Sequence, residues 1–246
     1  MSRPLGSERA APVARLRAVP ALRADDPEST PSFGLADAES LVPPMVLRGC
    51  REAAQRLGTA EMPMYGISSA IRGEGRSSIA LGVAAAECLD RQRRTVLVDL
   101  DLEAPSLHRR LGLAEAPRLD DALHDSINIE DHLQRFRGDL WLLAAWQTAG
   151  DAPRTLNRLA HSTLMSQLQE WAEAIVFDLP PVLGSSSGVE ASRFCTAPVL
   201  VVRAGVTPLP QVRDAVDVLG SRPSVILNGV TSRVPPWLRR ALGDWT

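Results

Sequence analysis

Residues 62–92, MPMYGISSAIRGEGRSSIALGVAAAECLDRQ, have the pattern of a strand, a glycine-rich loop and a helix in succession. The first part, 62–68, is short and apolar, which predicts a buried strand that runs into a glycine-bearing turn. The last part, 77–92, has a helix-forming composition, and its small residues suit close packing on a sheet. The loop between Ser69 and Ser78 would let successive backbone N–H groups converge on an anion, next to the positive end of the following helix.

This loop matches the phosphate-binding pattern G-x-x-x-x-G-K-[ST] with two substitutions. Ala70 stands in place of the first Gly, and Arg76 stands in place of the Lys. Ser77 falls where the pattern places a hydroxyl that binds Mg²⁺ beside the β- and γ-phosphates. The candidate ligand-binding residues of the loop are Gly73, Glu74, Gly75, Arg76, Ser77 and Ser78. A tight strand-to-helix connection without a ligand is the alternative interpretation of the loop taken alone.

Further apolar segments alternate with helical ones along the chain. Strands are expected at 95–101, 140–145, 174–180, 198–205 and 224–230, and helices at 45–57, around 154–172 and at 208–219. Continuous apolar runs without alternation are typical of parallel strands that are buried on both faces. The pattern predicts an α/β fold, with a doubly wound, mostly parallel, Rossmann-like sheet and helices on both faces. Ligands of such sheets bind at the carboxyl ends of the strands.

Three carboxylates lie at that edge of the predicted sheet. Asp99 and Asp101 are at the end of the strand 95–101, and Asp178 is near the end of the strand 174–180. Mg²⁺ takes one or two carboxylates together with phosphate oxygens and water. Asp101 and Asp178, with Ser77, are therefore the candidate metal ligands, and Asp99 is the candidate to activate or orient a nucleophile. A turn-capping role is the alternative for each Asp alone, but three together beside the loop favour a nucleotide site.

The composition excludes several classes of function. The chain of 246 residues is 45% apolar and has a formal net charge of −2, which argues against electrostatic binding of nucleic acid. Cys50, Cys88 and Cys195 are far apart and form no CxxC pair, which argues against a disulfide scaffold, a zinc site or an iron–sulfur cluster. We expect a cytoplasmic protein, because the sequence has no signal-peptide core and no apolar run long enough for a membrane span.

The two terminal segments differ from the region between them. Residues 1–44 hold seven of the 19 prolines and lack apolar periodicity, which predicts a flexible tail ahead of a nucleotide-binding domain at 45–230. The segment 231–246 contains PPWLRRALGDWT, whose Trp and Leu residues would share one face of a short helix. Such a helix suits a membrane interface or a membrane-protein partner, or it packs as a final helix on the sheet.

Taken together, the motifs resemble the cytoplasmic domain of bacterial tyrosine kinases, which control capsule and exopolysaccharide synthesis. The resemblance covers about residues 45–230 and rests on GEGRSS (73–78), VLVDLDLEAPSLHRRLGL (96–113), IVFDLPPVLG (175–184), VLVVRAGVTPLPQVRDAV (199–216) and LNGV (227–230). Chromosome-partitioning and division-site ATPases belong to the same superfamily.

This resemblance implies a P-loop NTPase that binds ATP and Mg²⁺, in which the three Asp serve the metal and catalysis and Asn228 lies near the adenine. It also implies a membrane polysaccharide co-polymerase or chain-length regulator as partner, a location at the inner face of the membrane through that partner, and self-association.

Four departures from the family pattern bear on activity. Arg76 replaces the P-loop Lys, and its planar guanidinium is a poor substitute for a compact ammonium in phosphoryl transfer. Glu103 stands where the motif usually has an Arg, so that contacts made by that Arg should be weakened. Tyr65 is the single tyrosine and is expected to be buried, and the C-terminal tail contains no tyrosine, which excludes autophosphorylation of a C-terminal tyrosine cluster. The positions of the family's oligomer-forming Glu-x-x-Arg-x-x-Arg are occupied by Met45, Arg48 and Arg51.

These observations favour a nucleotide-binding regulator of exopolysaccharide export with weak or absent kinase activity. An active ATPase or kinase that acts on other proteins is an alternative, supported by the three Asp. A partitioning-type ATPase that positions cargo at the membrane or nucleoid is another, although the acidic balance and the lack of a basic patch argue against DNA binding.

Overall fold

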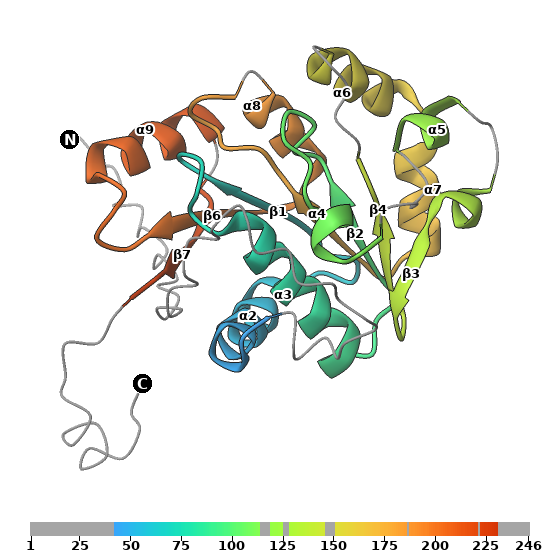
Figure 1. Cartoon of the computed structure of the whole chain (residues 1–246), viewed down its shortest axis with the longest axis horizontal. Coiled ribbons are helices and arrows are strands. Elements are labelled where there is room, and N and C mark those ends of the chain that lie inside the picture. Colours follow the sequence, from blue (N-terminus) through green and yellow to red (C-terminus); the bar gives the residue numbers. More distant parts are fainter. Residues whose placement is uncertain are drawn as a thin grey trace, which may run out of the picture.

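A seven-stranded sheet runs through the centre of the protein (Figure 1). The computed structural model describes residues 42–113, 119–124, 128–145, 151–185, 187–220 and 222–230. The strands are β1 (Met64–Ser69), β2 (Thr95–Asp99), β3 (Gln134–Arg137), β4 (Leu140–Leu143), β5 (Ala174–Asp178), β6 (Ala197–Arg203) and β7 (Ser224–Asn228). Their order across the sheet is β3-β4-β2-β5-β1-β6-β7.

The sheet is parallel except at one edge, where β3 and β4 are antiparallel. β1 lies between β5 and β6, and β5 lies between β1 and β2. The loops that follow these three inner strands, β1, β2 and β5, therefore emerge side by side at one edge of the sheet. This arrangement confirms the predicted α/β fold and brings the glycine-rich loop next to the segments that carry the three Asp.

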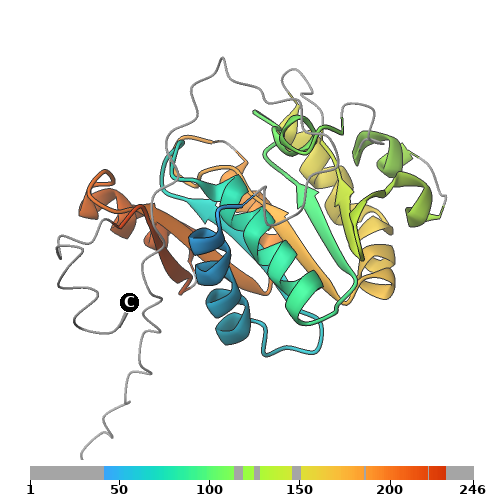
Figure 2. The ribbon, with the colours of Figure 1, turned by 60° about the horizontal axis from the view of Figure 1, so that its bottom comes forward.

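Helices cover both faces of the sheet (Figures 1 and 2). The helices are α2 (Pro44–Leu57), α3 (Arg76–Asp90), α4 (Leu107–Arg110), α5 (Leu119–His124), α6 (Ala152–His161), α7 (Leu164–Trp171), α8 (Gly188–Ala191) and α9 (Leu209–Leu219). Short 3-10 turns lie at η1 (Ile129–His132) and η2 (Ser192–Phe194).

Alternate residues of the inner strands enter two different cores. Leu97 of β2 packs with residues of α2 and α3 on one face of the sheet. Its neighbours Val96 and Val98 pack on the other face with residues of α6 and α7. Because side chains alternate across a strand, an inner strand must be apolar at successive positions to fill both cores. This explains the continuous apolar runs in the sequence.

Two elements differ from the sequence-based prediction. The helical region expected around 154–172 is divided into two helices, α6 and α7. They separate at Ser162, whose backbone is extended and whose hydroxyl donates to the Leu159 carbonyl and accepts from the Leu164 N–H. The strand β3 is not predicted, because its four residues are alternately half-buried and exposed at the sheet edge.

The first residues that the structure describes already belong to the packed domain. Val42 is buried against the first core, and α2 begins at Pro44. The rest of the predicted N-terminal tail, 1–41, and the C-terminal segment 231–246 lie outside the described residues. Across the part of the chain that is described, no helix has the length and apolar character needed to span a membrane.

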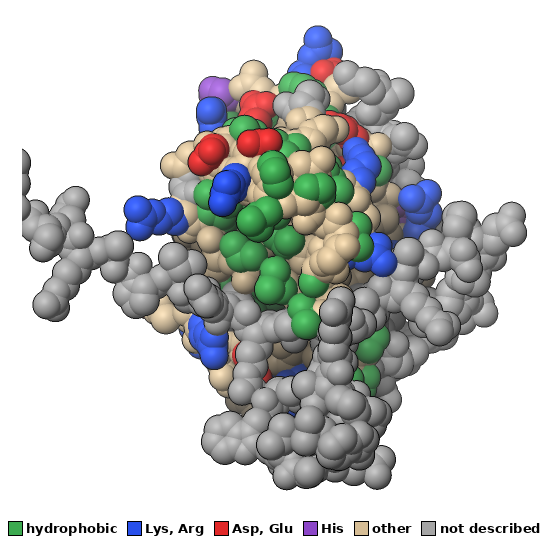
Figure 3. All heavy atoms as spheres, turned by 90° about the vertical axis from the view of Figure 1, so that its left-hand side faces the viewer, with side chains coloured by type: hydrophobic (Ala, Val, Ile, Leu, Met, Phe, Trp, Pro, Cys, Tyr) green, Lys and Arg blue, Asp and Glu red, His purple; other side chains and the backbone are tan. Residues whose placement is uncertain are grey.

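Apolar side chains gather on the surface near the β7 edge of the sheet. Figure 3, which faces this side of the molecule, shows them around α9 and β7. The exposed members from this region are Val206, Leu209, Val218 and Leu227.

Candidate functional site

The glycine-rich loop connects β1 to α3 and leaves the N-terminus of α3 open. Gly73 and Gly75 have φ values of 83° and 91°, in the left-handed region that favours glycine. A Cβ at Gly75 would collide with the Asn228 side chain, whereas a Cβ at Gly73 would meet nothing within 4 Å. Gly75 is the N-cap of α3 and makes no side-chain cap hydrogen bond. The first N–H groups of α3 are therefore the donors that a phosphate would engage.

Glu74 fixes the shape of the loop from inside the protein. Its buried carboxylate accepts hydrogen bonds at 3.0 Å from the backbone N–H of Ile71 and at 3.0 Å from the backbone N–H of Arg203. It also accepts a hydrogen bond from the Thr207 hydroxyl. The side chain is thus committed to tying the loop to the end of β6, and only the backbone of Glu74 is placed to serve a ligand.

Asn228, at the end of β7, contacts the same loop. Its Nδ2 donates to the Glu74 carbonyl at 2.8 Å. Its Oδ1 is buried and, among the described residues, has no hydrogen-bond partner. Asn228 therefore supports the loop and keeps one acceptor available for a donor from outside the described residues.

Arg76 does not point its charge at an open phosphate site. Its Nη2 lies 3.0 Å from Oδ2 of Asp101, and its Nη1 donates to the Leu179 carbonyl. The side chain is only 8% exposed. The guanidinium is therefore held by a carboxylate and a carbonyl that lie on the loops after β2 and β5, and it neutralises a carboxylate that the sequence assigns to the metal.

The carboxylates of Asp99 and Asp178 lie side by side on neighbouring strands, because the two residues are register partners of β2 and β5. Asp99 is fully buried and accepts from the backbone N–H groups of Asp101, Ser106 and Leu107 at 3.1–3.2 Å. Burial, together with the negative charge of Asp178, raises the pKa of Asp99, and the N–H donors oppose that shift. Asp99 organises the turn that leads into α4.

Asp178 is a buried carboxylate at the end of β5, close to Arg76 and Ser77. Both of its oxygens are buried, and neither makes a hydrogen bond to the residues that the structure describes. Burial raises the pKa of Asp178 to about 6, while Arg76 and the neighbouring Ser77 hydroxyl lower it. A buried carboxylate with two unused oxygens is an unfavourable arrangement unless a proton or a cation compensates it.

These groups fit a magnesium–nucleotide complex better than a metal bound by protein alone. No cluster of three or more His, Cys, Asp or Glu residues suitable for a metal occurs within the described ranges. Mg²⁺ does not need such a cluster, because phosphate oxygens and water supply most of its ligands. Asp178 has the unused oxygens for this role, and Ser77 lies beside it. Asp101 would have to break its ion pair with Arg76 before it could accept a hydrogen bond from a metal-bound water.

The structure adds two residues to the site, Arg72 and Arg110, that the sequence does not predict there. Arg72 of the loop pairs with Glu103 at 3.0 Å and lies 3.6 Å from Asp101. Arg110 of α4 donates to the Ser78 hydroxyl at 3.1 Å, and its charge lowers the pKa of Asp178. The position of Arg72 inside the glycine-rich loop is a sequence feature from which its place in the site could have been predicted. No local pattern marks Arg110 as a residue of this site.

Tyr65 is placed as the sequence predicts, inside the core. It is fully buried, and its hydroxyl donates to Glu87 at 2.5 Å. Glu87 also pairs with Arg91 and Arg93, each at 3.2 Å. This buried cluster belongs to the packing of α3 on β1 and places the tyrosine out of reach of a phosphate donor.

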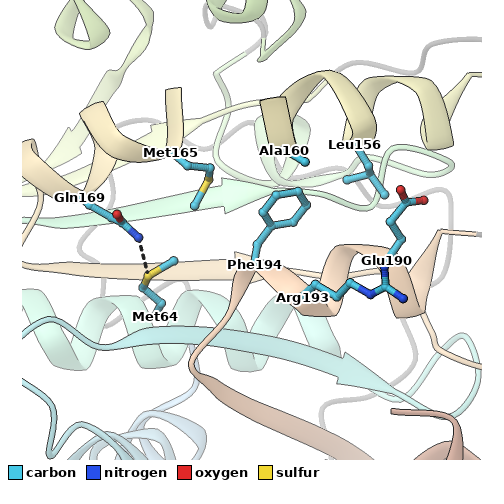
Figure 4. A pocket seen from close by; sticks show the side chains of 8 residues that line it. All are labelled: Met64, Leu156, Ala160, Met165, Gln169, Glu190, Arg193 and Phe194. Atoms are coloured by element: carbon cyan, nitrogen blue, oxygen red, sulfur yellow. Dashed lines mark hydrogen bonds between the residues drawn. The ribbon is translucent and has the colours of Figure 1, made fainter. Parts of the chain in front are cut away.

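A pocket lies away from the glycine-rich loop, near the amino-terminal end of β1. It has a volume of about 390 Å³ and opens between α6, α7 and the α8–η2 segment (Figure 4). Met64, Leu156, Met165 and Phe194 give it an apolar lining, and Glu190 and Arg193 lie at one side. It contains none of the predicted site residues.

Comparisons with known proteins agree with this geometry. No protein-family model matches the chain. The tyrosine-protein kinase YwqD of Bacillus subtilis is 26% identical over 175 residues, which cover 69% of this chain and 72% of that protein. The tyrosine-protein kinase ptk of Acinetobacter johnsonii is 22% identical over 168 residues, but the match spans only 23% of its length.

Solved structures show the same fold. The kinase domain of the Escherichia coli tyrosine kinase ETK superposes with a TM-score of 0.72 at 19% identity, covering 91% of this chain and 92% of that domain. The septum site-determining protein MinD of Pyrococcus horikoshii, solved in complex with Mg-ADP, superposes with a TM-score of 0.57 at 19% identity, covering 74% and 78%. The chain is thus a homologue of the bacterial tyrosine-protein kinases, with the P-loop ATPase fold that their kinase domains share.

Proposed function

We propose that this protein binds ATP with Mg²⁺ and regulates the synthesis and export of a capsular polysaccharide or exopolysaccharide, with weak or absent phosphoryl transfer of its own. Three features support nucleotide binding: the open N-terminus of α3, the oxygens of Asp178 and the Oδ1 of Asn228, of which the last two make no hydrogen bond to the described residues. The similarity to bacterial tyrosine-protein kinases supports the polysaccharide role.

One contact carries the proposal of weak turnover, namely the pairing of Arg76 with Asp101. Phosphoryl transfer depends on the position of cations around the moving group. Here Arg76, which occupies the position of the P-loop Lys, is held by the Asp101 carboxylate and by the Leu179 carbonyl. Reaching a transferring phosphate would cost Arg76 both partners, and its bulkier guanidinium would still not reproduce the position of an ammonium.

The other site residues would bind the phosphates, the metal and the adenine. Backbone N–H groups from Gly73 to Ser78 would bind the phosphates, with Ser77 and Asp178 on the metal side and Asp101 holding a metal-bound water. A bound magnesium ion would neutralise phosphate charge. Asp99 would orient a nucleophile only after giving up backbone contacts, and the Oδ1 of Asn228 would accept from the adenine amino group.

An active ATPase or kinase that acts on other proteins is the second candidate. The retention of three carboxylates at one edge of the sheet, two of them as register partners, favours it. Autophosphorylation of Tyr65 is not part of either candidate, because this residue is buried and bonded to Glu87. A partitioning-type ATPase shares the fold but has no further observation in its favour.

The proposed partner is a membrane polysaccharide co-polymerase or chain-length regulator, which would hold the protein at the inner face of the membrane. Self-association through α2 has weaker support. Arg51 pairs with Asp90 at 2.7 Å and Arg48 lies 3.8 Å from Glu52, so both arginines are already engaged within the chain. Met45 is exposed at the first position of the corresponding motif.

Titration calorimetry with ATP and ADP, with and without Mg²⁺, tests the proposal, together with a phosphate-release assay. We expect Mg²⁺-dependent binding by the wild type with little release of phosphate, and a gain of hydrolysis in Arg76→Lys. Rapid hydrolysis by the wild type would move the assignment to the active enzyme. Failure of both proteins to bind nucleotide would leave only a scaffold with the P-loop fold.

A further inference from the structure

Three loops meet at the carboxylate of Glu103. From the glycine-rich loop, Nη2 of Arg72 lies 3.0 Å from Oε2 of Glu103. From the loop after β5, the hydroxyl of Ser185 donates to Oε1 at 2.6 Å and the hydroxyl of Ser187 donates to the same oxygen at 3.3 Å. Glu103 itself belongs to the loop after β2. One carboxylate therefore ties together the three loops that surround the candidate nucleotide site.

This cluster is continuous with the phosphate site. Arg72 lies 3.6 Å from Asp101, and Asp101 in turn pairs with Arg76 at 3.0 Å. The Arg72 side chain is 46% exposed, while that of Glu103 is 28% exposed. Arg72 is therefore the outer cation of a row of charges that begins at the buried base of the loop and ends at its mouth.

The partners of Glu103 are the donors that bind phosphate in proteins. A guanidinium and two hydroxyls make charge-assisted hydrogen bonds to any oxyanion, whether it is a carboxylate or a phosphate. In the protein as described, the carboxylate of Glu103 satisfies all three of them. An incoming phosphate would meet this negative charge unless the carboxylate moved away or exchanged partners.

We propose that Arg72, Ser185 and Ser187 form an oxyanion site at the mouth of the loop, that Glu103 fills this site in the resting protein, and that the outer phosphate of a nucleotide must displace Glu103 to reach Arg72. The identification of that oxyanion as a nucleotide phosphate rests on the proposed function. Glu103 then acts as an internal competitor that lowers the affinity of the protein for the nucleotide. When no nucleotide is bound, Glu103 holds the three loops together.

The test uses the full chain and two probes, ATP with Mg²⁺ and inorganic tripolyphosphate, in titration calorimetry. The variant Glu103→Gln keeps the size of the side chain and an acceptor for the serines but removes the charge. We expect it to bind both probes about two- to fivefold more tightly than the wild type, a change within the range measured for partly exposed ion pairs. Glu61→Gln is the matched control, because Glu61 is exposed and precedes β1 at the opposite end of that strand from the loop.

Arg72→Gln is a second, independent variant. Because the Arg72 side chain is 46% exposed, we expect this variant to fold, which its thermal unfolding checks. It should weaken binding of both probes at least threefold while Glu61→Gln changes nothing. Wild-type affinity in Glu103→Gln, or in Arg72→Gln, would overturn the inference. If ATP binds to none of the proteins but tripolyphosphate binds Glu103→Gln more tightly than the wild type, the proposed function fails and the oxyanion site stands.

Discussion

The guanidinium of Arg76 and the carboxylate of Asp101, 3.0 Å apart, form a nearly buried ion pair at the base of the glycine-rich loop. Both residues belong to motifs that resemble the nucleotide-binding residues of bacterial tyrosine kinases, yet in this protein they satisfy one another. The pair connects the start of α3 to the loop after β2, so it contributes to the fold as well as to the site.

Removing one member of this pair should cost much stability. Arg76→Ala leaves the nearly buried Asp101 with only the half-exposed Arg72, 3.6 Å away, as a cation, and we expect the free energy of unfolding to fall by about 3 kcal/mol. In the double variant Arg76→Ala/Asp101→Asn the loss should be smaller than the sum of the single losses by about 1–2 kcal/mol. Urea denaturation measures both quantities.

The surface pair Arg51–Asp90, which reaches the same helix α3, is the matched control. Its side chains are more than a third exposed, so Arg51→Ala should cost less than about 1 kcal/mol. Equal losses at Arg51 and Arg76 would contradict the view that the inner pair is special.

Protein stability should depend on pH through Asp178. Because burial raises the pKa of Asp178 from 3.8 to about 6, the folded protein holds this proton more tightly than the unfolded chain. The favourable contribution is complete below the unfolded pKa and is lost as pH rises through about 6. Asp178→Asn should therefore stabilise the ligand-free protein at neutral pH, by about 2–3 kcal/mol, and progressively less toward pH 4.

Thermal unfolding of the wild type and of Asp178→Asn between pH 4 and 7.5 measures this difference. The exposed residue Asp214 of α9 offers a control, since Asp214→Asn should not reproduce the pH-dependent gain. A stability difference that stayed constant over this range would show that Asp178 does not titrate as its burial indicates.

The two glycines of the loop should differ in their tolerance of a side chain. Both have positive φ, so Ala at either position costs about 1–2 kcal/mol of backbone strain. At Gly75 the new Cβ also collides with Asn228, which holds the loop through the Glu74 carbonyl. We expect Gly75→Ala to abolish ATP binding and to destabilise the protein more than Gly73→Ala, as seen by calorimetry and urea denaturation. Equal effects at the two positions would argue against a structural role for the Asn228 contact.

Tyr65 should be important for stability and irrelevant to nucleotide binding. Tyr65→Phe removes the hydrogen bond to the buried Glu87 carboxylate, which should cost about 1–2 kcal/mol. Affinity for ATP should be unchanged, because Tyr65 belongs to the core and not to the loop. Mass spectrometry after incubation with ATP and Mg²⁺ should find no phosphate on Tyr65 of the wild type, and phosphotyrosine there would contradict its burial.

Short-range sequence patterns were sufficient for the architecture and for the loop. Each inner strand is buried on both faces, so its apolar run is visible without knowledge of its neighbours, and the motif GEGRSS places the glycines and hydroxyls within six residues. The edge strand β3 and the break at Ser162 escaped prediction because weak alternation and a single hydroxyl contact carry little local signal.

The relationships between the charges depended on the folding of segments far apart in the chain. Strand order brings the loops after β1, β2 and β5 together. This contact turns Arg76 toward Asp101, joins Arg72 to Glu103 and leaves both oxygens of Asp178 without a hydrogen bond to the described residues. The sequence contains every one of these residues but cannot specify which cation meets which carboxylate. Ion pairing depends on distances of a few ångströms and on burial, and both are set by the packing of the whole sheet.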